Sequence, residues 1–148
     1  MDAAAHREVA VASYQRCWEL LDQPVRSNGD DVELLTSAFT SRFHWGHAGG
    51  PQEWIIADWM VSRAAAAAGL GQLAVWFATR ADAATDGADV PDWLRASTAE
   101  GVARAYGASG DPERRDRWIA RAEALVAAIA DEGDRELIAG QLASVPRA

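Results

Sequence analysis

The chain of 148 residues is long enough for one compact domain that buries roughly two thirds of its unfolded surface without a disulfide or a metal. Its hydrophobic fraction of 49% and charged fraction of 24% are those of an ordinary folded protein, which excludes a disordered chain. A net charge of -8 argues against nucleic acid as a partner, and the complete absence of lysine excludes Schiff-base chemistry and a P-loop lysine.

The first predicted hairpin covers residues 3–45. Its first helix, over about residues 3–22, has two apolar faces and is therefore expected to be buried on two sides. Pro24 and Gly29 mark the turn that follows. Asp30 is the predicted N-cap of the second helix, with Glu33 completing a capping box. That helix is expected to end at Trp45, because glycines interrupt residues 46–50.

The second and third hairpins are predicted over residues 51–86 and 91–130. Prolines suit the first turn at the start of both, and a final helix over 134–143 is expected to cover the end of the stack. Gly101 lies on an apolar face, where we expect a crossing helix to approach closely. No segment alternates with a period of two, so no strand is predicted.

Glycine-marked turns recur at almost equal intervals, at Gly29, Gly69 and Gly110. A spacing of about 40 residues is typical of helical solenoid units, which are stable because neighbouring hairpins stack. The sequence therefore predicts a single all-α domain over residues 1–148, built from antiparallel helical hairpins stacked as a short solenoid of about seven helices.

The third hairpin resembles a tetratricopeptide-type unit, because small residues, an aromatic residue and a turn glycine stand at the offsets of that repeat: Ala103, Tyr106, Gly110, Ile119 and Ala122. The second hairpin matches at Gly69, Ala74, Ala78 and Ala81, although its period exceeds the usual length of about 34 residues. The chain is also similar to short bacterial tetratricopeptide-like proteins with a Ser-Arg-aromatic-His-Trp string, here residues 41–45, followed by an acid-Trp-x-x-Ser-Arg string, here residues 58–63. The resemblance implies a helical-repeat protein and singles out these two strings.

Polar and aromatic side chains of the two strings, with Trp54 between them, form the candidate ligand-binding set: Arg42, His44, Trp45, Trp54, Asp58, Trp59, Ser62 and Arg63. Because the second and third helices are predicted to be antiparallel neighbours, we expect the strings to meet at one end of the groove between them. His44 oriented by Asp58 could then act as an acid or base, while Arg42 and Arg63 grip an anion between tryptophan walls. The alternative is a structural clamp in which Asp58 pairs with Arg42 or Arg63 and the tryptophans pack in the core.

Two further patterns carry little chemistry. His44 and His47 form an H-x-x-H string, but Gly46 separates them and the sequence offers no third ligand, so neither a metal nor a cofactor is expected. Cys17 falls on an apolar face and is predicted to be an inert core thiol.

The architecture favours a noncatalytic binding module that recognises a protein segment or peptide in its concave groove, with a homodimer as a further expectation. The alternative is a protein, or a small enzyme, that binds a small anionic ligand in a pocket made by His44, Asp58, Arg42 and Arg63. No apolar leader or membrane-length segment is present, so a cytoplasmic location and no membrane partner are expected.

Overall fold

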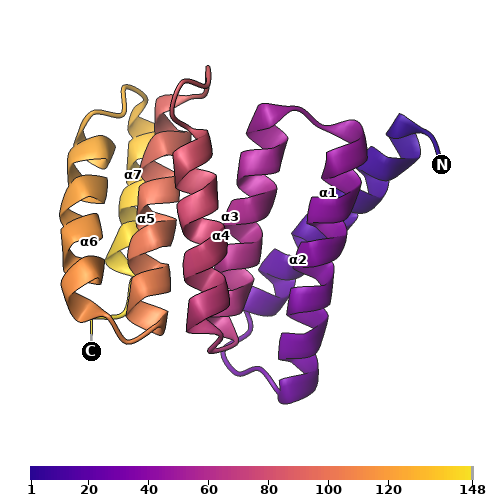
Figure 1. Cartoon of the computed structure of the whole chain (residues 1–148), viewed down its shortest axis with the longest axis horizontal. Coiled ribbons are helices and arrows are strands. Elements are labelled where there is room, and N and C mark those ends of the chain that lie inside the picture. The colour runs from indigo at the N-terminus through magenta and orange to yellow at the C-terminus, as the bar shows by residue number, and fades with distance from the viewer. Residues whose placement is uncertain (148) are drawn as a thin grey trace.

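The computed structural model describes residues 1–147 and folds them into seven α-helices and no strand. This confirms the prediction of an all-α fold built from stacked helical hairpins. The helices are α1 (Ala3–Leu21), α2 (Asn28–Ala48), α3 (Pro51–Ala67), α4 (Gly71–Ala84), α5 (Asp92–Ala108), α6 (Pro112–Ala127) and α7 (Glu132–Ala143) (Figure 1).

Three antiparallel hairpins, α1/α2, α3/α4 and α5/α6, follow one another along the stack, and α7 packs against both helices of the last hairpin (Figure 1). Each odd-numbered helix touches the next odd-numbered helix. Among the described residues, no Cα atoms of α2, α4 and α6 come within 8 Å of one another. The odd-numbered helices therefore form the closely packed side of the stack, and spaces between the even-numbered helices are bridged only by side chains.

The ends of α2 differ from the prediction. Ser27, and not Asp30, is the N-cap: its hydroxyl accepts from the Asp30 N–H at 3.1 Å, while the Asp30 carboxylate accepts from the Ser27 N–H at 2.9 Å. At the other end α2 continues through Gly46 to Ala48, because a glycine weakens a helix without blocking its hydrogen bonds. The expected end at Trp45 is therefore one turn too early.

Two of the three marker glycines do what the sequence predicts. Gly69 and Gly110 have positive φ of 78° and 80°, and the residue after each donates back across the turn, from Leu70 to the Ala65 carbonyl and from Asp111 to the Tyr106 carbonyl. Gly29 instead lies in the first turn of α2. The apparent period of the first hairpin was therefore coincidental.

The helices α3 and α5 approach each other closely in the middle of the stack. A Cβ atom added to Gly101 would lie 2.9 Å from Cδ1 of Trp59, which confirms the prediction that a helix crosses at this glycine. The Trp59 indole N–H donates to the carbonyl of Ser97 at 3.1 Å, so its polar edge is satisfied although the ring is buried. As a result α3 is held at the centre, in contact with α1, α2, α4 and α5.

Candidate functional site

The two polar strings do not converge on one site. Successive residues of a helix project about 100° apart, so Asp58 and Arg63 on α3 point about 140° away from each other. Asp58 faces α2 and α4, whereas Arg63 faces α1 and α5. His44 pairs with a residue of α1 rather than with Asp58. The expectation of one pocket made by His44, Asp58, Arg42 and Arg63 is therefore wrong.

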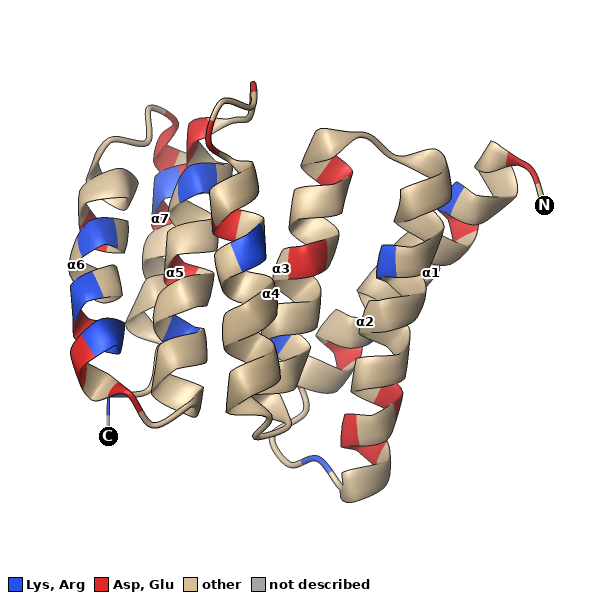
Figure 2. Ribbon diagram, viewed as in Figure 1, with Lys and Arg blue, Asp and Glu red and all other residues tan. Residues whose placement is uncertain are grey.

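Asp58 joins three helices through two arginines. Its Oδ1 accepts from Nε of Arg42 on α2 at 2.9 Å, and its Oδ2 accepts from Nε of Arg80 on α4 at 2.9 Å. The carboxylate is only 6% exposed, whereas the arginine side chains are 34% and 51% exposed. Figure 2 shows the matching charge pattern, with an acidic band on α3 between basic bands on α2 and α4. Arg42 is the partner that the sequence predicts, and Arg80 takes the place expected for Arg63.

A pocket of about 440 Å³ opens beside this trio, lined by Arg42, Gly46, Pro51, Trp54, Ile55, Asp58, Arg80 and Ala84. Both arginines bond Asp58 through Nε, and within the described residues their outer nitrogens have no hydrogen-bond partner. The Trp54 indole N–H donates to the carbonyl of Trp45 at 2.9 Å, which fixes its ring as one wall. The Arg80 guanidinium lies 5.7 Å from the centre of the Trp76 ring. Two cations are thus held in fixed positions beside an apolar space.

His44 belongs to a cluster with the other two histidines of the chain. Its Nδ1 lies 2.8 Å from Nδ1 of His6 on α1, and the rings of His6 and His47 stack with centres 4.5 Å apart. Because α2 continues through Gly46, His44 and His47 lie one turn apart on the same helix, contrary to the sequence interpretation. Nothing in the sequence pointed to His6, which is 38 residues from His44. Across residues 1–147, no three His, Cys, Asp or Glu side chains are arranged to hold a metal ion.

Acid should weaken the contact between α1 and α2 at this cluster. Partial burial lowers the pKa of His6 below its usual 6.5, and repulsion from His47 and His44 lowers it further. The folded protein therefore takes up the His6 proton at a lower pH than the unfolded chain, so stability is lost as the pH falls below about 6.5. We expect the urea midpoint to drop between pH 7.5 and pH 5.5, and His6→Gln to lessen that drop. If the urea midpoint of His6→Gln drops between pH 7.5 and pH 5.5 as much as that of the wild type, protonation of His6 does not weaken the contact between α1 and α2.

Arg63 lies at a buried charge cluster on the other side of α3. Its guanidinium lies 5.5 Å from the centre of the Trp18 ring and 5.9 Å from that of Trp59. Its Nη1 is 3.7 Å from Oε1 of the fully buried Glu100, which also accepts from Arg104 at 2.7 Å. Burial, together with the nearby charge of Arg104, lowers the pKa of Arg63 to about 10, although the charge of Glu100 opposes this shift. Glu100 and Arg104 are not among the predicted site residues, although their i, i+4 spacing on an apolar helix indicates a pair.

Only a small cavity, of about 210 Å³, adjoins this cluster between α3 and α5, and Arg63 and Arg104 both line it. The odd-numbered helices pack closely on this side of the stack. That this protein binds a protein segment or peptide in a concave groove of the stack stays a prediction.

The remaining residues of the predicted set have structural contacts. Ser62 is buried and donates to the carbonyl of Ala74 at 3.0 Å. Trp45 is buried beneath the guanidinium of Arg7, which lies 5.2 Å from its ring centre. Trp59 fills the space beside Gly101. Of the three tryptophans predicted to line a ligand pocket, Trp54 alone lines the pocket beside Asp58.

Cys17 is fully buried, and burial raises the pKa of its thiol to about 12. Its Sγ lies 3.8 Å from the carbonyl of Leu34 in α2. A thiol with so high a pKa carries almost no thiolate near neutral pH, which is the state predicted for an inert core cysteine.

No protein-family model, curated protein or solved structure matches the chain. None of the helices within residues 1–147 is both long enough and apolar enough to cross a membrane.

Proposed function

We propose that this protein binds a small organic anion in the pocket between α2, α3 and α4. One observation carries the proposal: a single buried carboxylate, that of Asp58, holds Arg42 and Arg80 through Nε and leaves their outer nitrogens available beside a cavity of about 440 Å³. Two guanidiniums and one carboxylate leave one net positive charge at the pocket. Guanidinium groups suit carboxylate and phosphate oxygens because their N–H groups form a planar fork.

Asp58 acts as the positioning residue of this site. It compensates one of the two positive charges, and because each of its oxygens accepts from one arginine it fixes both guanidinium groups. A ligand therefore meets cations that are already oriented, which lowers the entropy cost of binding.

The apolar residues that line the pocket indicate the chemistry of the uncharged part of the ligand. Trp54, Ile55 and Pro51 provide apolar surface next to the cations. An anion with an apolar, preferably planar, body would place its charge between the arginines and its body against Trp54. Besides Asp58 and the two arginines, no titratable side chain in the described part of the chain lines the pocket. We therefore propose binding without catalysis.

Arg80→Gln tests the proposal, because Arg80 is half exposed and can be replaced without opening the core. Loss of a charged hydrogen bond costs about 1.5–3 kcal/mol, so affinity should fall about tenfold to a hundredfold. Titration calorimetry with phenyl phosphate and with benzoate measures this change, and the affinity of the wild type should also fall as salt is added.

The matched control is Arg117→Gln on α6, whose side chain is 68% exposed and bonds only to Glu113 within the described residues. It removes the same charge from the protein far from the pocket and should leave affinity unchanged. If neither phenyl phosphate nor benzoate binds the wild type, the pocket does not have this function. The same conclusion follows if Arg80→Gln and Arg117→Gln bind these anions with equal affinity.

A further inference from the structure

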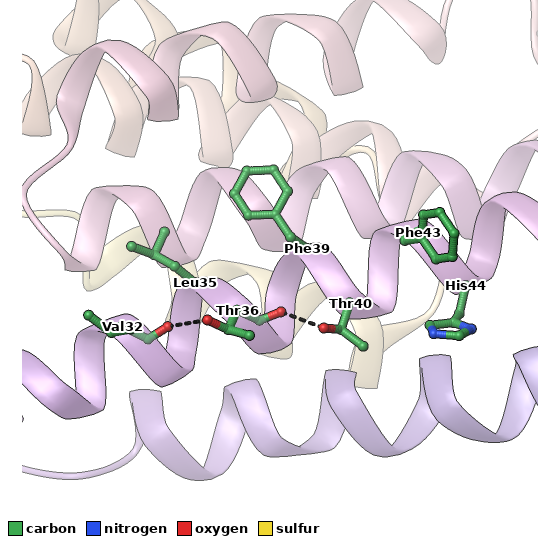
Figure 3. Close-up of a pocket in the computed structure, with 7 residues that line it drawn as sticks. All are labelled: Val32, Leu35, Thr36, Phe39, Thr40, Phe43 and His44. Atoms are coloured by element: carbon green, nitrogen blue, oxygen red, sulfur yellow. Dashed lines mark hydrogen bonds between the residues drawn. The ribbon is translucent and has the colours of Figure 1, made fainter.

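An apolar face of α2 is only partly covered by the other helices of the stack. It consists of Val32, Leu35, Thr36, Phe39, Thr40, Phe43 and His44, which line a shallow groove (Figure 3). Val32 is 64% exposed and Phe43 is 59% exposed, and Phe39 is also exposed. Trp76 of α4 extends the apolar area, because it packs on Phe77, which in turn packs edge-on against Phe39. We refer to the seven lining residues as the α2 face.

The two hydroxyl groups of the α2 face are already satisfied within the helix. Thr36 donates to the carbonyl of Val32 at 2.8 Å, and Thr40 donates to the carbonyl of Thr36 at 2.7 Å (Figure 3). Covering this face would therefore leave neither hydroxyl without a partner, and the usual penalty for burying an unpaired hydroxyl does not arise.

The α2 face is self-complementary when one copy runs opposite to another. Val32 and Phe43 lie equally far from the midpoint between Ser37 and Ala38, and so do Leu35 and Thr40, and Thr36 and Phe39. A two-fold axis through that midpoint places Val32 of one copy against Phe43 of the second copy, and brings Thr36 together with Phe39. Such an interface uses the same patch on both copies, as closed symmetric dimers do.

The polar residues at the two ends of α2 are compatible with the same antiparallel arrangement, because imidazole N–H groups can donate to carboxylates. Asp30, Asp31 and Glu33 lie in the first two turns of α2, where Figure 2 shows several acidic positions close together on the ribbon, while His44 and His47 lie near the other end. In the antiparallel pair the acidic start of one α2 lies against the histidine end of the second copy. The opposed helix dipoles are favourable as well.

From these observations we propose that the α2 face joins two copies of this chain in an antiparallel, two-fold symmetric dimer. The α2 face runs from residue 32 to residue 44, which is about 18 Å along the helix axis. A contact of that length is small for a specific interface, so the dimer should be weak and dissociate at micromolar concentrations. The inference is independent of the anion pocket, which lies on another side of α2.

Sedimentation velocity over a concentration series tests the dimer. The wild type should change from monomer to dimer between about 1 μM and about 1 mM, and Phe43→Asp should stay monomeric because it places a charge against the apolar Val32 of the second copy at both ends of the contact. Leu137→Asp on α7 is the control, since Leu137 is equally exposed but lies outside the α2 face. Circular dichroism and thermal melting show whether each variant keeps the fold.

A cysteine near the symmetry axis tests the geometry. Thr36→Cys should form a disulfide with its counterpart under mild oxidation, because both copies bring this position close to the axis. The native Cys17 does not interfere, as it is fully buried. Leu137→Cys is the control and should not cross-link. A wild type that stays monomeric at about 1 mM, a dimer that Phe43→Asp leaves intact, or equal cross-linking of the two cysteine variants would overturn the proposal.

Discussion

Replacing Glu100 by glutamine is expected to lower the free energy of unfolding by about 3–5 kcal/mol, because it leaves buried cations without their counter-charge. Glu100 is fully buried, accepts from Nε and Nη2 of Arg104, and lies 3.7 Å from Nη1 of Arg63. Glutamine keeps the volume and an acceptor oxygen but removes the negative charge. Urea unfolding followed by tryptophan fluorescence measures the loss.

Glu123→Gln provides the matched comparison, since Glu123 is 60% exposed and its contact with Arg147 is a long surface pair at 3.7 Å. Its expected effect is below about 0.5 kcal/mol. Arg104→Met should be less harmful in the Glu100→Gln background than in the wild type, because the two changes remove the same interaction. If the losses of unfolding free energy caused by Glu100→Gln and Arg104→Met simply add in the double variant, the charge cluster does not stabilise the stack. A loss below about 1 kcal/mol for Glu100→Gln alone would show the same.

Gly71→Ala is expected to destabilise the protein by about 1–3 kcal/mol, although alanine is the better helix former. The added Cβ would lie 2.5 Å from Cα of Ser109 and 2.6 Å from the carbonyl oxygen of Ala108. Both are backbone atoms at the end of α5, so the contact cannot be relieved by turning a side chain. The start of α4 must move away from α5, which weakens the packing between the second and third hairpins. Thermal unfolding of the two proteins measures the loss.

Gly140→Ala should instead raise the free energy of unfolding. Gly140 lies within α7, and a Cβ there would meet nothing within 4 Å. Alanine should stabilise the helix by about 0.5–1 kcal/mol because it restricts the unfolded chain. If Gly71→Ala also stabilises the protein, the close approach of α4 and α5 is not required by the fold.

Much of the fold could be predicted because helix starts and turns are local in sequence. Pro51 lies in the first turn of α3 as expected, and Gly69 and Gly110 form the turns assigned to them. The predicted ends of α2 are wrong because local signals compete there. Ser27 and Asp30 are both good N-cap residues, and only the structure shows that Asp30 serves as the third residue of the helix instead. Gly46 shows that one glycine does not end a helix.

The candidate site was harder to predict because it depends on which sides of α3 meet which helices. The pairing of Arg42 with Asp58 follows from the short connection between α2 and α3. Arg80 and His6 reach their partners across 22 and 38 residues, and the sequence holds no periodic signal for contacts of that range. Asp58 and Arg63 are five residues apart on one helix and therefore point about 140° away from each other, an angle that the sequence alone provides.

The place of the proposed anion pocket in the stack has a consequence for motion. Among the described residues, the backbones of α1 and α2 pack, outside their own pairing, only against α3, and Asp58 ties α2 to α4 through the two arginines. An anion held by both arginines would strengthen that tie, so each opening of the first hairpin would require release of the ligand. Ligand concentration would then govern how often the N-terminal third of the chain detaches from an otherwise intact protein.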